Sequence, residues 1–444
     1  MSSSCRRLYV AIGAGAIIGL TSGVRADNWE FVPRIEGGGT YNDNYRLAEN
    51  SADKLRVYGP YIDASLNAQI VGPSGSKFQI IPRVHSTFFP TDHADQSTDG
   101  YLNFDGEYKT LRSDFNAIGQ YANETVIYSE LLPATFPGLA LGQVVAAQTG
   151  RVSLRNREQL GSFRPSYIYD LTQRLHLNLG GEYDRASFNH GAIQQVGYSN
   201  YMGTAGLGFD VSERSVFTVT GFGSRFLPEE GGHDTSTYGL NLQWDLRESQ
   251  IAQYYARVGA NRSRADATFT TVTTTTEPGP RRTVVNVTTT TTTNETVATS
   301  GITGGVGMDL RYEVTEVRLD LLRSLTPSDA GAQVISNEAR FRVLHAFEPR
   351  FSGFAGLRAV QVRGSSSRVG LTIQGEDYVA AETGLDYQIT QNYRVEGTYY
   401  YTWQRFQGEP RAASNAFTLS VIYQPLSRYE PLPELNGLPV GLPE

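Results

Sequence analysis

Side chains alternate between apolar and polar along Lys77–Phe88, which reads KFQIIPRVHSTF. Phe78 and Val84 fall in one set of alternate positions, whereas Arg83 and His85 fall in the other. Successive side chains of a β-strand point to opposite faces of its sheet. The stretch therefore predicts a strand with one oily face and one polar face, and the question is which solvent meets each face.

The same alternation recurs along the chain. We find it in these segments: Trp29–Tyr41, Tyr101–Tyr108, Leu175–Tyr183, Tyr238–Leu246 and Tyr393–Trp403. Aromatic residues stand near several strand ends, as in the girdles that flank the apolar band of membrane barrels. A repeated two-residue period over this length predicts an all-β fold.

The connections between these strands alternate in length. Short polar turns fall at Gly72–Ser76, Leu111–Asp114, Thr172–Arg174, Asp210–Arg214, Arg247–Ser249, Glu313–Thr315, Glu348–Pro349 and Thr390–Asn392. Long segments separate them at Asn42–Asp53, Pro90–Thr98, Val126–Gly161, Asn189–Ser199, Leu227–Thr235, Arg264–Ala298, Leu325–Gln333, Arg363–Gln374 and Gln407–Ala413. This order predicts about 18 antiparallel strands. The expected fold is a transmembrane outer-membrane β-barrel with short periplasmic turns and long extracellular loops, because a sheet in hydrocarbon must close on itself.

The two ends of the chain differ from the strands. Residues 1–26 carry Arg6 and Arg7, an apolar core and a small-x-small site, which predicts a secretory signal peptide and a mature chain from Asp27. Residues 27–424 are the expected barrel. Residues 425–444 form a Pro-rich tail expected in the periplasm, either docking a partner or disordered.

The composition of the chain limits the kinds of partner and fold that it can have. Removing the signal peptide takes three arginines, so Lys+Arg falls from 38 to 35 against 45 Asp+Glu, a net charge of −10. This balance argues against a nucleic-acid partner. The signal peptide holds Cys5, the only cysteine, so the mature chain has no disulfide to rely on. No run of about 18 apolar residues follows the N-terminus, which excludes a transmembrane helix there.

The polar faces of the strands predict the lining of a pore. The expected pore-lining residues are Arg34, Glu36, Lys77, Arg83, Asp105, Glu107, Lys109, Arg164, Glu182, Asp245, Arg257, Arg311, Arg318, Asp320, Arg340, Arg342, Arg358, Glu382, Arg394 and Glu396, with Asp184 and Asp386 beside them. A mixture of signs predicts weak ion selectivity and passage of polar cargo, since a ring of one sign would select ions. Many of these charges are equally expected to neutralise each other across neighbouring strands. Tyrosines of the same faces have two readings, stacking on sugar rings or packing within the wall: Tyr61, Tyr101, Tyr255 and Tyr400.

Two long loops leave alternatives open. Val126–Gly161 has a mixed apolar pattern and is expected either to fold inward and narrow the pore or to cap the rim. Arg264–Ala298 is rich in threonine around the turn EPGP, which predicts a hairpin continuing two barrel strands above the membrane. Its hydroxyls either contact sugars or are solvated low-complexity sequence.

Motifs of catalysis and metal binding are absent from the sequence. It has no Gly-x-Ser-x-Gly, HExxH or P-loop, and none of its six histidines pair at metal-ligand spacing. Asp-His contacts across strands, as in barrel hydrolases, stay open as a minor alternative. Asn42–Asn44 and Asp92–Asp95 present oxygen ligands suited to Ca²⁺, and Asx turns are the competing interpretation. We predict no cofactor and no enzyme activity.

The first mature strand also resembles a known family. WEFVPRIEGGGTYNDNYRL, at Trp29–Leu47, resembles the start of the β-barrel porin-2 family, which is similar to the barrels of exopolysaccharide export systems. The resemblance implies an outer-membrane channel, polysaccharide cargo and periplasmic polysaccharide export proteins as partners. Outer-membrane barrels usually end on an aromatic residue that is read by the outer-membrane assembly machinery, whereas this chain ends at Glu444. The matching alternation is internal, and we expect Tyr423 to end the last strand.

The sequence thus predicts a porin-like channel in the outer membrane of a Gram-negative bacterium, surrounded by outer-membrane lipid and passing polar solutes. Exopolysaccharide export is the sharper version of this hypothesis. The alternative is a closed structural or surface-binding barrel that acts through its extracellular loops.

Overall fold

The computed structural model describes residues 29–72, 76–90, 96–125, 157–189, 196–229, 234–278, 284–328, 332–363 and 375–426. In these ranges the chain forms 18 antiparallel strands and one short 3-10 helix, η1 (Ser51–Asp53). The strands are β1 (Trp29–Asn42), β2 (Val57–Val71), β3 (Lys77–Thr87), β4 (Ser97–Lys109), β5 (Ser113–Thr125), β6 (Arg157–Asp170), β7 (Leu175–Phe188), β8 (Tyr198–Ser212), β9 (Ser215–Pro228), β10 (Asp234–Arg247), β11 (Ala252–Pro278), β12 (Val284–Arg311), β13 (Thr315–Ser328), β14 (Ala332–Glu348), β15 (Phe351–Arg363), β16 (Glu376–Gln388), β17 (Tyr393–Phe406) and β18 (Arg411–Tyr423). No helix in the described ranges is long and apolar enough to cross a membrane.

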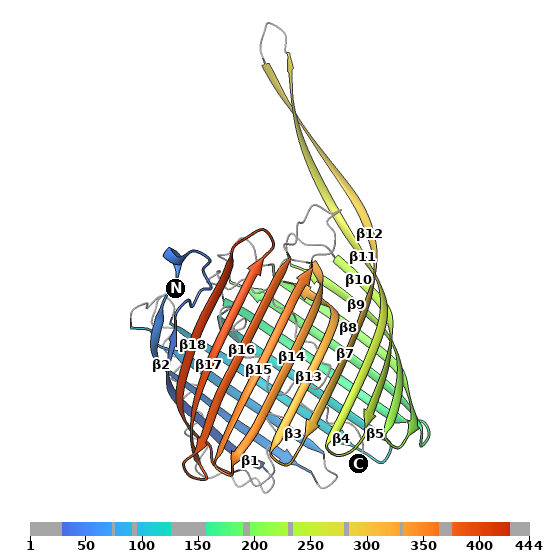
Figure 1. Cartoon of the computed structure of the whole chain (residues 1–444). Helices are drawn as coiled ribbons and strands as arrows, with labels where there is room; N and C mark the ends of the chain where they lie inside the picture. Colours follow the sequence, from blue (N-terminus) through green and yellow to red (C-terminus); the bar gives the residue numbers. More distant parts are fainter. Residues whose placement is uncertain are drawn as a thin grey trace.

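The sheet closes into a barrel. Each strand pairs with its neighbours in the sequence, and β18 pairs with β1 from Ile35↔Tyr423 to Asn42↔Ala416 (Figure 1). The last strand ends at Tyr423, as the sequence predicts. The number of strands, their antiparallel order and the closure confirm the predicted fold class.

The short and long connections lie at opposite ends of the barrel, as predicted. Only two residues separate β8 from β9, and two separate β14 from β15, at the lower rim in Figure 1. The upper rim carries the longest connections, including the 14 residues between β1 and β2, and the extended hairpin of β11 and β12, although only three residues separate β13 from β14 there. The loop predicted at Val126–Gly161 is shorter in the structure, because β6 already begins at Arg157; the segment before it lies outside the described residues.

The outer face of the barrel is apolar over one band. On β16, β17 and β18 the outward positions are largely aliphatic or aromatic, and Leu385, Tyr399 and Leu419 are 54%, 41% and 53% exposed. The band runs for about ten residues on each strand, the length a tilted strand needs to cross the hydrocarbon of a bilayer. Large apolar side chains at this exposure stand in lipid in a transmembrane barrel, where water-exposed patches of such size would be unfavourable.

A line of polar side chains ends the apolar band on the side of the long loops. In direct register across β13 to β18, neighbouring outward positions pair from Arg323↔Asn337 to Arg405↔Arg411. We call this line the polar belt; its members are Arg323, Asn337, Gln361, Asp377, Arg405 and Arg411. The belt ends the row of outward apolar side chains on these strands.

The stretch Lys77–Phe88, which contains β3, also has an apolar outer face and a polar inner face. Phe78 and Val84 are 41% and 37% exposed on the outer face, while His85 and Thr87 are buried on the inner face. The polar face of this strand therefore meets the lumen and the oily face meets lipid, as the alternation predicts.

Candidate lumen and pore wall

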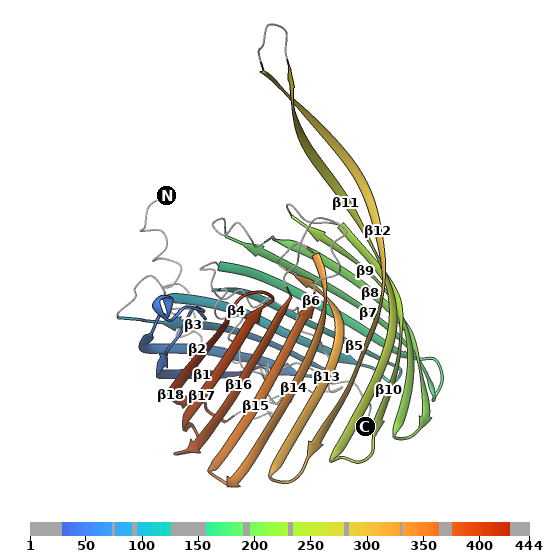
Figure 2. The same cartoon turned by 45° about the horizontal axis from the view of Figure 1, so that its top comes forward.

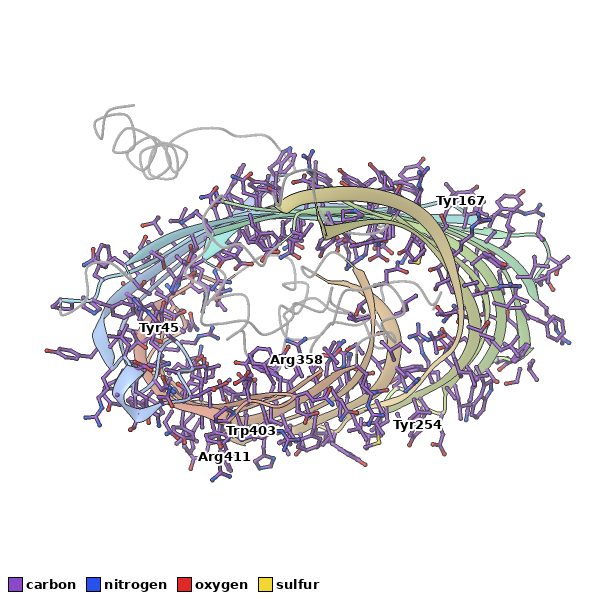
Figure 3. All side chains as sticks on the ribbon, turned by 90° about the horizontal axis from the view of Figure 1, so that it is seen from above. Tyr45, Tyr167, Tyr254, Arg358, Trp403 and Arg411 are labelled. Atoms are coloured by element: carbon purple, nitrogen blue, oxygen red, sulfur yellow. The ribbon has the colours of Figure 1, made fainter. Side chains whose placement is uncertain are left out.

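The predicted pore-lining residues all fall on inward positions, alternating with the outward apolar ones. Figure 3 looks down the barrel and shows an oval ring, with Arg358 directed into the lumen and Trp403 and Arg411 on the outside. Cross-strand pairs bring inward positions side by side, because directly opposed residues of an antiparallel pair share one face. Arg318 lies opposite Arg342, and Arg340 lies opposite Arg358.

One polar network joins β1, β2 and β3 around Asp63, which is 2% exposed. The Arg83 guanidinium donates to the Asp63 carboxylate, with Nε–Oδ2 and Nη2–Oδ2 distances of 2.8 Å. His85 Nδ1 lies 3.0 Å from the same carboxylate, and Arg34 Nη1 lies 3.8 Å from Oδ1. Arg34 also donates to Glu36 at 2.6 Å. One buried carboxylate on β2 thus holds three basic side chains, one from β1 and two from β3.

A second network joins β14 and β15 around Glu338. Arg340 Nε and Arg358 Nε both donate to Glu338 Oε1, at 2.9 and 2.8 Å. On the neighbouring strand β13, Arg318 Nε lies 3.5 Å from Oδ2 of Asp320, two residues along the same strand. These acids separate arginines that would otherwise repel each other in direct register.

Arginines near the lower rim are less completely paired. The Nε atoms of Arg34, Arg311, Arg342 and Arg394 are buried and have no hydrogen-bond partner among the described residues. Arg311 Nη2 donates to Asp309 at 3.1 Å, and Arg394 Nε lies 3.5 Å from Asp386. Charged groups with unused hydrogen-bonding capacity line this end of the lumen.

The lumen tyrosines bond to carboxylates of the wall. Tyr61 donates to Glu36 at 2.6 Å, Tyr101 donates to Glu124 at 2.9 Å, and Tyr255 donates to Asp320 at 3.0 Å. Tyr255 is only 5% exposed. For these three residues the geometry favours packing within the wall over stacking on a sugar.

Sequence reasoning missed several inward acids. The missed residues are Asp63, Asp99, Glu124, Glu158, Asp309 and Glu338. The signal was present, because Asp63, Ser65 and Gln69 alternate with apolar residues in YIDASLNAQI at Tyr61–Ile70. The predicted set held more basic than acidic side chains, and these acids bring the wall closer to electrical balance.

Two Asp-His contacts cross strands, as the minor hydrolase alternative requires. Besides His85, His176 is bound on both ring nitrogens, by Asp170 at 2.7 Å and by Asp210 at 2.9 Å. A histidine engaged by carboxylates on both sides offers no ring nitrogen to activate a hydroxyl. Within the described ranges, no group of three or more His, Cys, Asp or Glu side chains is arranged to hold a metal ion.

The segment Asn42–Asn44 is hydrogen-bonded to β18, where the first and last strands close the barrel. The Asn42 carboxamide oxygen accepts from the Asn44 backbone N–H at 2.8 Å and from Ser414 at 2.8 Å, while Asp43 accepts from the backbone and side chain of Asn415 at 2.7 Å. Asn44 donates to the carbonyl of Ala413 at 2.9 Å. These oxygens are used by the protein itself, so the Asx interpretation holds over the Ca²⁺ one. The second candidate, Asp92–Asp95, lies outside the described residues.

The upper part of the β13–β14 hairpin leaves the wall. The β12–β13 ladder stops at Gly304↔Arg323, and above it β12 pairs only with β11 and β13 only with β14. The first residues of β14 instead contact β9 and β10, and Thr237 Oγ1 of β10 donates to Gln333 Oε1 of β14 at 2.9 Å. Thr237 and Gln333 are 2% and 7% exposed. Figures 2 and 3 show this hairpin end curving inside the ring formed by β10, β11 and β12.

The inward hairpin narrows the lumen from one side. Its departure from β12 begins at Arg323, a member of the polar belt, whose Nε donates to the backbone carbonyl of Ile302 at 3.0 Å. This hydrogen bond satisfies a backbone acceptor at the point where the two strands separate. The loop Val126–Gly161, expected either to narrow the pore or to cap the rim, lies mostly outside the described residues. The sequence analysis did not predict that the β13–β14 hairpin would narrow the lumen.

No family model matches the chain, and no curated protein sequence matches it. Among solved structures, the chain is similar to OccK2 (OpdF) of Pseudomonas aeruginosa in complex with glucuronate, at 12% identity and a TM-score of 0.43 over 90% of this chain and 99% of that one. It is also similar to the outer-membrane channel DcaP of Acinetobacter baumannii, at 10% identity and 0.39 over 89% and 96%. The copper transporter OprC matches at 10% identity and 0.44 over 89% and 69%. At these low values, the fold is assigned from the strand order and register of the chain itself.

Proposed function

We propose that this protein is a porin-like channel of the Gram-negative outer membrane that passes polar solutes. The observation that carries the proposal is the contrast between the two faces of the closed barrel. The outer face has an apolar band ended by the polar belt, and the inner face carries charged networks such as those of Asp63 and Glu338. An 18-stranded barrel has the diameter for an aqueous channel, whereas an eight-stranded one is filled by its side chains.

The mixture of charges defines the expected selectivity. Each arginine of the Glu338 network lies within 3 Å of a carboxylate oxygen, so neither sign dominates that wall. Polar, weakly charged solutes are therefore the cargo class, in line with the principle that one-sign rings select ions. Export of exopolysaccharide, with periplasmic export proteins as partners and membership of the β-barrel porin-2 family, is the sharper form, and it is supported by the resemblance of Trp29–Leu47 alone.

Planar-bilayer recording tests the channel. The full mature chain, refolded in detergent, is expected to insert as discrete conductance steps in KCl, with a reversal potential close to zero under a salt gradient. Neutral and acidic polysaccharides added on either side are expected to reduce the current if sugar polymers enter the lumen. Silence after insertion, verified by protease protection of the membrane-embedded strands in the same vesicles, would contradict the proposal.

A closed barrel acting through its surface is the second candidate. It is favoured by the inward β13–β14 hairpin and by the β11–β12 hairpin, which projects far beyond the rim (Figure 1). Liposome swelling separates the two: a closed barrel leaves liposomes impermeable to small sugars, and a channel lets them swell.

A further inference from the structure

The polar belt carries an uneven distribution of charge. Arg323, Arg405 and Arg411 stand against one acid, Asp377, and Arg363 lies one outward position above Gln361. Arg405 is 55% exposed and Asp377 is 32% exposed. The belt is thus a positively charged line on the outside of the barrel, at the boundary of the apolar band.

Two of these arginines face each other. Arg405 and Arg411 are directly opposed at the top of β17 and β18, on the same outward face. Like charges directly opposed across strands destabilise a sheet, unless an anion lies between them. Arg405 Nη2 donates to Asp377 at 2.8 Å, and the side chain of Arg411 has no hydrogen bond or ion pair to any described residue. One carboxylate therefore serves one member of the pair, and the other keeps its full hydrogen-bonding capacity.

The neighbours of the pair direct it toward the membrane. The Arg405 guanidinium lies 5.9 Å from the ring centroid of Trp403, the next outward residue on the lipid side. Trp and Arg together are the side chains that anchor a barrel at a membrane interface. An anion bound at Arg405 and Arg411 would have Trp403 and Ala413, the next outward residues of β17 and β18, on its lipid side.

We propose that Arg405 and Arg411 form a binding site for the phosphate of a lipid headgroup in the outer leaflet. The occupant is a phosphorylated acyl lipid, because its phosphate matches the arginine pair and its chains match the apolar band below. Arginine binds phosphate through two parallel N–H donors, which suits an anion shared by two guanidinium groups. Asp377 is itself held by Gln361, whose Nε2 donates to its carboxylate at 3.0 Å. The proposal concerns the outer surface and does not depend on whether the barrel conducts.

Trp403 provides the readout. In a Trp29→Phe/Trp244→Phe background it is the single tryptophan, because the chain has three. The folded protein is titrated in mixed micelles with dibrominated phosphatidic acid, whose bromines quench a tryptophan in contact with its chains, and separately with dibrominated phosphatidylcholine. We expect Trp403 to be quenched at a roughly tenfold to thirtyfold lower mole fraction of the phosphatidic acid, in line with the contribution of two arginines at a membrane surface.

Matched variants separate this site from general surface charge. Arg405→Gln/Arg411→Gln is expected to abolish the preference, and Asp377→Asn is expected to increase it. The control Arg185→Gln/Arg225→Gln removes two other outward arginines near the same rim, each already paired with an acid, and is expected to keep it. Equal quenching by both lipids in the parent, or a preference that survives Arg405→Gln/Arg411→Gln, would overturn the proposal.

Two further measurements close the test. Heat-modifiable mobility in gels verifies that each variant is a folded barrel before titration. Inorganic phosphate is then added at constant ionic strength: a lipid site keeps its preference, because the acyl chains contribute to binding. Complete displacement by inorganic phosphate, at concentrations where chloride has no effect, would assign the pair to a free anion and would reject the lipid headgroup.

Discussion

At the scale of single residues, Asp63 is a buried acid of the lumen that contacts three basic side chains. It is 2% exposed and receives Arg83, His85 and Arg34. We expect Asp63→Ala to lower the free energy of unfolding by about 2 kcal/mol, less than the loss for a fully buried ion pair because Arg83 keeps contact with water. Guanidinium unfolding of the detergent-refolded barrel measures the change.

The control for Asp63 is Asp53→Ala, in the exposed η1 helix, which is expected to stay within about 0.5 kcal/mol of the parent. An equally small effect of Asp63→Ala would mean that the three basic side chains do not depend on this carboxylate.

The directly opposed Arg318 and Arg342 offer a residue-scale test of selectivity. Replacing both by glutamine leaves Asp309, Asp320 and Glu382 on the same wall, so the local charge becomes negative. We expect the reversal potential in a KCl gradient to shift toward cation preference. Arg323→Gln, on the outer face, is the matched control, and an unchanged reversal potential in the double variant would remove this wall from the conduction path.

At the scale of elements, the β13–β14 hairpin is the described structure that enters the lumen. Replacing Thr326–Val334 by a two-residue turn shortens both strands to the height of their neighbours, where β14 still pairs with β15. We expect a larger single-channel conductance, because the obstruction packed on Thr237 is gone. A conductance equal to that of the parent would show that another segment limits the current.

The β11–β12 hairpin should be separable from the barrel. Beyond Asp266, β11 pairs with β12 alone, and β12 meets β13 only from Gly304 downward. An isolated two-stranded ribbon is marginally stable and contributes little to the rest of a sheet. Replacing Asp266–Thr296 by Asn-Gly joins the two strands with a tight hairpin turn.

For this deletion we expect unchanged unfolding in guanidinium and unchanged conductance steps. A less stable barrel would imply that the ribbon supports the upper wall, and a larger conductance would imply that it shields the entrance.

At the scale of the whole molecule, the sequence predicted the barrel because its signal is repeated many times. A two-residue period in Lys77–Phe88 and Tyr393–Trp403, with long and short connections alternating between them, leaves few other folds for the chain. Errors in individual strand ends do not alter the topology. The parity of each strand also placed Arg340 and Arg358 on the inner face, because a one-residue slip would move every apolar side chain inward.

Other features were beyond the sequence. The inward turn of the β13–β14 hairpin depends on contacts with Thr237 on β10, far away along the chain, and nothing in Leu325–Gln333 marks a departure from the wall. The acids Asp63 and Glu338 were visible as alternating polar positions, but their roles depend on which arginines the register brings opposite. Local patterns determine faces, while register and tertiary contacts determine partners.

Placement in a membrane is a property of the whole molecule. Trp29 and Trp244 are outward residues 37% and 43% exposed on the half of the barrel near the short turns, and Trp403 stands just below the polar belt. We expect blue-shifted emission in lipid vesicles that is quenched most by lipids labelled near the headgroups. Solubility of the chain as a compact monomer without detergent, with emission typical of water, would refute the transmembrane barrel.

The β11–β12 hairpin has a consequence for encounters at the cell surface. About 12 paired residues beyond the barrel correspond to an extension of about 40 Å, at the usual rise of a strand. In an outer membrane, a bacteriophage tail or an antibody approaching the cell would contact the projecting β11–β12 hairpin before it reached the mouth of the barrel. Under selection by antibodies or bacteriophages, sequence variation should therefore be greater in the projecting part of the β11–β12 hairpin than at the entrance of the barrel.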